Sequence, residues 1–162
     1  MADRGGAAGS VAEAKDLVAA VDRAARLWPD RPAWTFDPGE SLTFADVARR
    51  SAGLAAALAD QRVAVGDRVA VMMANRAEFP LTWVALARLG ATMVPLNPQY
   101  RADDAGHILE HSRAASVVAS GDLTGCVREA LACADLDVPV LGVEQLPGAG
   151  LQLGACNHLP AQ

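Results

Sequence analysis

SGDLTG (120–125) is the stretch whose residues and position come nearest to phosphate chemistry. It follows an apolar run and precedes a helical pattern, and backbone N–H groups at such a junction attract anions. A nucleotide-binding loop of the G-x-x-x-x-G-K-[ST] type also needs a lysine against the phosphates, and the only lysine of the chain is Lys15. We therefore expect an ordinary turn between a strand and a helix, capped by Asp122.

His107 and His111 lie four residues apart in a helical stretch, a spacing that can bring two imidazoles to one metal ion. Asp103 or Asp104 would lie one turn earlier on the same helix. The metalloprotease pattern H-E-x-x-H is absent, because Ile108 and not a glutamate comes directly after His107, and no further ligand is evident. Two solvated histidines on a helix surface are the simpler interpretation, so we assign no metal site.

Cysteine and glycine patterns give no catalytic site either. Cys126 and Cys133 lie seven residues apart on one predicted helix face, where we expect buried thiols without a basic partner. GAGLQLG (148–154) has three glycines, but its last interval is too long for G-x-G-x-x-G, so we expect a loop. No G-x-S-x-G nucleophile motif occurs. We therefore name no catalytic, cofactor-binding or metal-binding residue.

A helix, a hairpin and a second helix are predicted ahead of the main sheet. Apolar side chains recur every three or four residues over 17–28, which predicts a helix. Residues 31–44 contain two short β-forming runs around a DPGE turn, which predicts a hairpin. Thr43 and Asp46 have the spacing of a capping box, so a second helix is expected from Thr43 to about Gln61.

Residues 66–143 alternate four apolar runs with three helical patterns, joined by short loops. Apolar runs without polar alternation are typical of strands covered on both faces, as in parallel sheets. The β-α-β order therefore predicts an α/β fold with a doubly wound, mostly parallel sheet behind the N-terminal helix and hairpin. The expected buried strands are 69–74, 91–96, 115–120 and 138–143, and the expected helices are 75–90, 101–112 and 123–134.

Helix-capping residues and prolines indicate where these elements begin and end. Asn75 with Glu78 has the spacing of a helix cap pair, and Gly90 stands where a C-terminal glycine cap belongs. The next strand ends in Pro95-Leu96-Asn97-Pro98, whose loop is directed at the carboxyl edge of the sheet. Loops at that edge hold the ligands of open α/β sheets. This loop is therefore the one that a ligand site would use.

The domain limits follow from the same patterns. Residues 1–10 are small and glycine-rich, and we expect them to be disordered. Residues 11–143 carry the periodic elements, and we expect them to form one domain. Residues 144–162 lose all periodicity, and we expect an irregular tail.

Composition and charge exclude several classes of protein. Acidic residues outnumber basic ones by 19 to 14, and the formal charge of −5 argues against a nucleic-acid partner. No apolar run approaches the ~18 residues of a membrane span, and the N-terminus lacks the apolar core of a secretory signal. Three cysteines without paired C-x-x-C spacing suit free thiols in a reducing compartment, so we expect a cytoplasmic protein.

Three long segments follow one another at natural spacing: LTFADVARRSAGLAAAL (42–58), GDRVAVMMANRAEFPLTWVALARLGATMVPLNP (66–98) and RADDAGHILEHSRAASVVAS (101–120). They resemble the N-terminal part of the adenylate-forming acyl-CoA synthetases and ligases, the AMP-binding enzymes. The family patterns concerned are L-[TS]-[YF]-x-[ED]-L, G-D-x-V-A-x-x-x-x-N-x-x-E-[FY] and K-x-G-A-x-x-V-P-[LI]-[DN]-P. The resemblance covers about residues 14–143, and NRAEF with MVPLN is most similar to carnitine, crotonobetaine and fatty-acyl ligases.

The resemblance implies ATP, Mg²⁺ and coenzyme A as family cofactors, and none of them is expected for this chain alone. The family holds phosphate with a Ser/Thr/Gly-rich loop that ends in Pro-Lys and uses a second lysine on a C-terminal domain. Neither occurs in these 162 residues. We therefore expect the truncated front portion of such a ligase, incomplete relative to the family's full N-terminal domain and inactive alone. The alternative is a non-catalytic module that self-associates through an exposed sheet edge or complements a separately encoded remainder.

Overall fold

The computed structural model describes residues 15–36 and 40–148, and every element predicted for this part of the chain is present. Differences from the predicted boundaries amount to a few residues. In chain order the elements are α1 (Leu17–Leu27), β1 (Pro32–Thr35), β2 (Ser41–Thr43), α2 (Phe44–Asp60), β3 (Arg68–Met72), α3 (Glu78–Leu89), β4 (Thr92–Leu96), α4 (Ala102–Ser112), β5 (Ser116–Ala119), a 3-10 turn at Gly121–Leu123, α5 (Thr124–Cys133), β6 (Val140–Gly142) and a 3-10 turn at Val143–Gln145.

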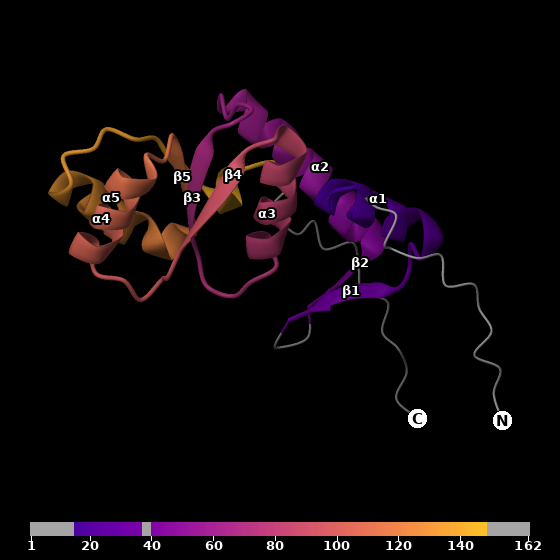
Figure 1. Cartoon of the computed structure of the whole chain (residues 1–162). Helices are drawn as coiled ribbons and strands as arrows, with labels where there is room; N and C mark the ends of the chain where they lie inside the picture. Colours follow the sequence, from indigo (N-terminus) through magenta and orange to yellow (C-terminus); the bar gives the residue numbers. More distant parts are fainter. Residues whose placement is uncertain (1–14, 37–39, 149–162) are drawn as a thin grey trace, which may run out of the picture.

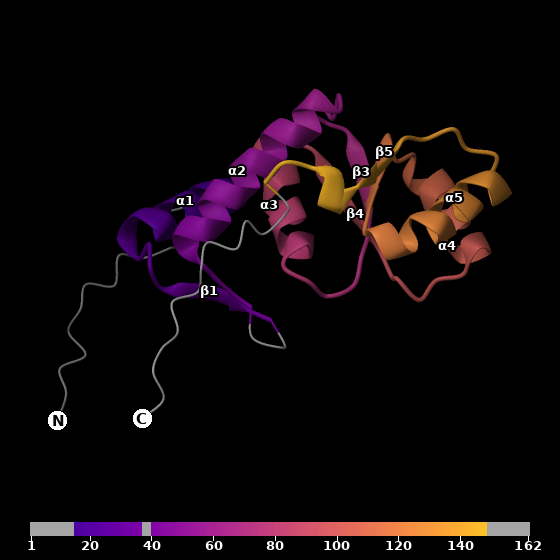
Figure 2. The ribbon, with the colours of Figure 1, turned by 180° about the vertical axis from the view of Figure 1, so that it is seen from behind.

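The main sheet has four parallel strands in the order β4-β3-β5-β6. Helices cover both of its faces, with α2 and α3 on one side and α4 and α5 on the other (Figures 1 and 2). The hairpin β1–β2 is antiparallel and lies beside α1 and α2, away from the main sheet (Figure 1). The predicted α/β fold with a doubly wound parallel sheet is therefore confirmed.

Side-chain alternation along the central strand divides the core into two layers. Val69 and Val71 of β3 pack among the residues of α2 and α3. Ala70 and Met72 face the other way, into the layer formed with α4 and α5. All four side chains are fully buried, because each face of this central strand is covered by helices.

The prediction that residues 91–96 form a strand buried on both faces is wrong. β4 is an outer strand of the sheet, and Leu96 is its only buried residue. Its apolar run resembles that of a central strand, but among residues 15–36 and 40–148 only β3 pairs with β4. The division of the chain at residue 143 stays a prediction, since residues 1–10 and 149–162 lie outside the described part. Leu146, three residues past that limit, is buried in the core.

Two helix caps confirm the sequence signals that predicted them. Thr43 Oγ1 accepts a hydrogen bond from the backbone N–H of Asp46 at 3.1 Å, and the Asp46 carboxylate accepts one from the N–H of Thr43 at 3.1 Å. Gly90 ends α3 in the left-handed conformation with φ of 70°, which glycine adopts without strain. The capping box fixes the start of α2, and Gly90 turns the chain into β4.

The capping box predicts an acid-dependent loss of stability. Burial raises the pKa of Asp46, but the hydrogen bonds from Thr43 and the charges of Arg49 and Arg50 outweigh it and hold the pKa below its ordinary value of 3.8. A carboxylate with a depressed folded-state pKa stabilises the fold above its unfolded-state pKa and loses that contribution as pH falls through the folded value. In denaturant titrations between pH 6 and 3, the Asp46→Asn variant is therefore expected to lose less stability than the unmodified chain. Equal losses would contradict this account of the cap.

Within the part of the chain that the structure describes, no helix combines the length and the apolar content that a bilayer crossing needs.

Candidate functional site

The topology places a candidate site at the carboxyl edge of the sheet, between β3 and β5. The chain leaves β3 toward α3 on one face and leaves β5 toward α5 on the opposite face. Where two neighbouring parallel strands send their connections to opposite faces, the loops diverge and leave a crevice in which ligands bind. The residues that follow the two strands are 73–77 and 120–123.

A charged network connects the loops at this point. The Nε of Arg76 lies 2.7 Å from Oε2 of Glu78, and its Nη1 lies 2.8 Å from Oε1 of Glu144. The second carboxylate oxygen of Glu144 accepts a hydrogen bond from the backbone N–H of Gly121 at 3.1 Å. We call Arg76, Glu78, Glu144 and the Gly121 N–H the switch-point network. It connects the loops that follow β3, β5 and β6.

The electrostatics of the network keep Arg76 charged. The hydrogen bond to Glu78 raises the pKa of the Arg76 guanidinium above its ordinary value, burial opposes the rise, and the charges of Glu78 and Glu144 add to it. Ser120, next to Gly121 in the chain, is buried, and its hydroxyl has no hydrogen-bond partner among the described residues. The switch-point network therefore has Arg76 as its cation, which two carboxylates neutralise, and the unused Ser120 hydroxyl lies next to it in the chain.

The switch-point network competes with a phosphate group at this point. The backbone N–H of Gly121 is one donor that the SGDLTG turn could offer to an anion, and the chain's own Glu144 carboxylate already occupies it. The nearby cation, Arg76, is engaged by two carboxylates, so a phosphate would have to displace both of them. The predicted Asp122 cap is wrong, because Thr124 begins α5 and no side chain caps that helix. Thr124 Oγ1 instead donates to the Gly121 carbonyl at 2.8 Å.

A second feature of the same edge is the loop that follows β4. The Asn97 side chain accepts a hydrogen bond from the N–H of Gln99, and the N–H of Tyr100 donates to the Asn97 carbonyl at 3.0 Å. This turn holds the two prolines in place and closes one side of a pocket of about 440 Å³. The pocket is mainly apolar and is lined by Met73, Ala74, Asn75, Phe79, Pro95, Leu96, Asn97, Pro98 and Tyr100. The loop singled out in the sequence therefore borders a pocket at the carboxyl edge.

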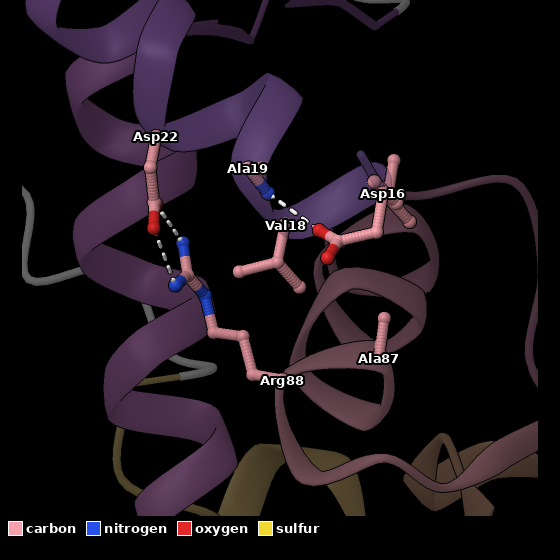
Figure 3. A pocket seen from close by; sticks show the side chains of 7 residues that line it. Asp16, Val18, Ala19, Asp22, Ala87 and Arg88 are labelled. Carbon is pink, nitrogen blue, oxygen red and sulfur yellow. Dashed lines mark hydrogen bonds and ion pairs between the residues drawn. The ribbon is translucent and has the colours of Figure 1, made fainter. Parts of the chain in front are cut away.

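A larger pocket, about 650 Å³, lies between α1 and the last turn of α3. Figure 3 shows two of its charged groups facing each other: the Arg88 guanidinium donates to both carboxylate oxygens of Asp22, at 2.5 and 3.2 Å. Asp16 accepts from the N–H of Ala19 and caps α1. The polar groups of this pocket thus bind one another, and it lies toward the amino end of the strands. We interpret it as a structural joint between helices.

The other candidates from the sequence have different outcomes. His107 and His111 are both exposed on α4, with ring centroids 6.3 Å apart, and no group of three metal-ligating side chains occurs within residues 15–36 and 40–148. The expectation of buried thiols is wrong for Cys133, which is exposed, whereas Cys126 is half-buried; both are free. The reason is their position on α5, whose buried face consists of Val127, Ala130 and Leu131. All of GAGLQLG except its first glycine lies outside the described residues.

The sequence patterns do not predict the switch-point network. Glu78 was predicted to pair with Asn75 as a helix cap, which is wrong, because Ala77 precedes α3 and no side chain caps this helix. The carboxylate of Glu78 binds Arg76 instead. A charged pair right after a buried strand was a usable local signal for Arg76 and Glu78. No local signal could have found Glu144, which lies 68 residues away from Arg76 in the chain.

The network predicts a measurable change at one backbone amide. Glu144→Ala removes the acceptor of the Gly121 N–H, and a hydrogen bond to a charged group contributes about 1.5 kcal/mol. Hydrogen exchange at Gly121 is therefore expected to become about tenfold faster. Glu129→Ala, at an exposed position on α5, is the matched control and should leave the rate unchanged. Equal rates at Gly121 in all three proteins would contradict the hydrogen bond.

Comparison with known proteins gives a consistent result. The family model described as "AMP-binding enzyme" matches residues 21–152 of this chain. The AMB antimetabolite synthetase AmbE of Pseudomonas aeruginosa is 35% identical over 144 residues, which is 89% of this chain and 7% of that protein. A long-chain-fatty-acid–CoA ligase of Haemophilus influenzae is 37% identical over 98 residues, covering 60% of this chain and 17% of the ligase.

Solved structures agree with the sequence matches. A crystal structure from Rhodopseudomonas palustris that bears the name of a long-chain-fatty-acid CoA ligase aligns with a TM-score of 0.72 and 31% identity. The alignment covers 84% of this chain and 35% of that chain. The present chain thus spans about a third of that protein's length and a smaller share of the two sequence relatives.

Proposed function

Because the chain belongs to the AMP-binding enzyme family, we propose that it is the N-terminal portion of an AMP-forming acyl-CoA ligase. The observation that carries this proposal is the alignment with the Rhodopseudomonas palustris protein, which includes most of the chain at 31% identity. The Haemophilus influenzae relative, a long-chain-fatty-acid–CoA ligase, supports a fatty acid as the substrate class. The segments NRAEF and MVPLN carry the same resemblance in the sequence.

ATP, Mg²⁺ and coenzyme A supply the chemistry of this family when they are bound: a carboxylate is activated as an acyl-adenylate and then transferred to a thiol. The activation step requires a cradle for phosphate and a cation against developing negative charge. In this chain the only lysine, Lys15, precedes α1, and the carboxyl-edge cation Arg76 is held by Glu78 and Glu144. We infer that the chain alone forms neither acyl-adenylate nor acyl-CoA.

What this chain contributes is architectural in our proposal. The parallel sheet holds the loop after β4 at the carboxyl edge, where Pro95 and Pro98 fix its direction. The apolar pocket of about 440 Å³ beside that loop can take part of a hydrocarbon chain. Free thiols at Cys126 and Cys133 fit a reducing compartment such as the cytoplasm.

A chimera tests the proposal. Residues 15–148 would replace the aligned segment of the Rhodopseudomonas palustris protein, and acyl-CoA formation from ATP, coenzyme A and fatty acids would be measured. We expect thioester formation by the chimera and none by the Rhodopseudomonas remainder alone. A chimera that is monomeric and cooperatively folded, yet makes no thioester with any fatty acid that the parent protein uses, would overturn the assignment.

The second candidate is a non-catalytic module that joins another chain through a sheet edge. It is favoured by one observation: β4 and β6 each pair with a single neighbouring strand in the part of the chain that the structure describes. A strand with one unpaired side can pair with a strand of another polypeptide.

A further inference from the structure

The exposed face of α4 brings two of the three histidines of the chain together. His107 and His111 lie four residues apart, about one helical turn, and both side chains are exposed. Their ring centroids are 6.3 Å apart, and their ring planes differ by only 19°. Side chains at this spacing lie one above the other on a helix, so the two imidazoles share one solvent-facing side of α4.

The opposite side of α4 is packed against the rest of the fold. Leu109 is buried, and Gly106 lies so close to α5 that an added Cβ would stand 2.8 Å from the carbonyl oxygen of Ala130. At the end of the helix, the Arg68 guanidinium donates to the carbonyl of Ser112. The helix that carries the two histidines is therefore anchored along its inner side and at its C-terminal end. Anchoring reduces the entropy that is lost when a ligand joins the two side chains.

Two imidazoles at this spacing can chelate one divalent transition-metal ion. Imidazole nitrogen is a favoured ligand of Zn²⁺, Ni²⁺ and Cu²⁺, and two histidines four residues apart supply two of the ligands in helical zinc sites. Both rings are exposed, so their side chains can rotate until a nitrogen of each ring meets the same ion. Once one ring has bound, the second bond forms within the molecule, which makes two imidazoles bind far more tightly than one.

Acidic side chains lie near the pair on the same helix. Asp103 and Asp104 belong to the first turn of α4, four and three residues before His107, and Glu110 follows three residues after it; all three are exposed. Carboxylates at these positions attract a divalent cation and accept hydrogen bonds from water molecules that the ion holds. No group of three metal-ligating side chains occurs within residues 15–36 and 40–148, so water would fill the remaining positions of the ion. Open positions are typical of a site from which the metal exchanges.

We propose that His107 and His111 bind a divalent transition-metal ion of the Zn²⁺ or Ni²⁺ type on the exposed face of α4. The spacing in the sequence favoured two solvated side chains. The structure adds an anchored helix, nearly parallel rings and three exposed carboxylates on the same helix. The bound ion joins the last two turns of α4 and stabilises that helix. The site does not depend on the proposed function.

Calorimetric titration of the full chain with Ni²⁺ tests the proposal. Ni²⁺ is the probe because Cu²⁺ would oxidise the free thiols of Cys126 and Cys133. We expect one ion to bind at micromolar concentration, and Mg²⁺, which prefers oxygen ligands, not to displace it. His107→Ala and His111→Ala should each weaken binding at least tenfold, because each variant keeps a single imidazole of the pair. With Zn²⁺, hydrogen exchange should slow at the amides of residues 110–112 in the unmodified chain and not in His111→Ala.

Three control variants separate the pair from other ligands in the chain. Ala56→His, added to His107→Ala, restores the number of histidines, but Ala56 lies exposed on α2, across the sheet from α4. This double variant should bind Ni²⁺ as weakly as His107→Ala alone. His158→Ala changes the third histidine, which lies outside the described residues, and Cys133→Ser removes an exposed thiol. Both should bind Ni²⁺ as tightly as the unmodified chain.

Several results would each overturn the proposal: no binding below millimolar Ni²⁺, unchanged affinity in both histidine variants, or tight binding by the double variant with Ala56→His. Weaker binding by His158→Ala or Cys133→Ser would do so too, because it would assign the ion to ligands outside the pair. Displacement by Mg²⁺ would assign the ion to the carboxylates, and unchanged hydrogen exchange at saturating Zn²⁺ would remove it from α4. Thioester formation by the chimera is expected whether or not these histidines bind metal, so the two proposals fail independently.

Discussion

Replacing Gly106 with leucine should lower the free energy of unfolding by about 3 kcal/mol and the melting temperature by roughly 10 °C. Gly106 lies on α4, where that helix crosses α5, and an added Cβ would stand 2.8 Å from the backbone carbonyl oxygen of Ala130. A backbone atom cannot rotate away as a side-chain end can, so the helices must separate. Because α4 and α5 together cover one face of the sheet, their separation also opens the core that these helices form with β3 and β5.

The matched comparison is between the variants Gly125→Ala and Gly106→Ala. Gly125, on α5, has no atom within 4 Å of an added Cβ, so Gly125→Ala should raise stability by up to about 1 kcal/mol through helix propensity. Gly106→Ala gains the same propensity but meets the Ala130 carbonyl, and we expect a net loss. Urea titrations of both variants measure whether each substitution raises or lowers the free energy of unfolding. Stabilisation by Gly106→Ala would show that the contact between α4 and α5 is looser than the structure has it.

Arg88→Ala has the second largest expected effect, a decrease of about 2 kcal/mol in the free energy of unfolding. Arg88 joins three helices: its side chain on α3 donates to Asp22 on α1 and, through Nε, to the hydroxyl of Ser51 on α2 at 3.0 Å. The Arg88 side chain is only 15% exposed, so this ion pair is less screened by water than a surface pair. Its loss removes the ion pair between α1 and α3 and leaves the buried Ser51 with one acceptor, the carbonyl of Ala48.

Arg49→Ala is the matched control for Arg88. Arg49 forms an ion pair with Asp46 at 2.6 Å, but its side chain is 74% exposed, and such pairs contribute under about 1 kcal/mol. A double-mutant cycle of Asp22→Ala and Arg88→Ala should give a coupling energy above 1 kcal/mol. If Arg88→Ala lowers the free energy of unfolding no more than Arg49→Ala does, the ion pair between Arg88 and Asp22 in Figure 3 does not stabilise the fold.

Local patterns predicted the elements well because each has a local cause. Thr43 and Asp46 cap α2 through bonds within three residues, and Gly90 ends α3 through its own φ. The position of each strand in the sheet has no such cause. Residues 91–96 read as a buried strand, and only the order β4-β3-β5-β6 makes β4 an edge. The exposure of Cys133 likewise depends on which face of α5 meets the sheet.

The candidate site was less accessible from the sequence than the fold. The double-proline loop was predicted to lie at the carboxyl edge, and the structure places a pocket there. The switch-point network depends on Glu144, which reaches Arg76 only because β6 lies beside β5 and ends at the same edge. A contact between residues 68 positions apart depends on the order of the strands in the sheet, and no single sequence motif predicts that order.

In our proposal, this chain supplies the sheet and an edge pocket of an AMP-binding enzyme but not its phosphate machinery. The most direct test is exchange of labelled pyrophosphate into ATP by the purified chain, with fatty acids of several lengths. We predict no exchange that depends on added acid. Acid-dependent exchange that co-purifies with the chain and disappears in the Gly106→Leu variant would contradict the claim.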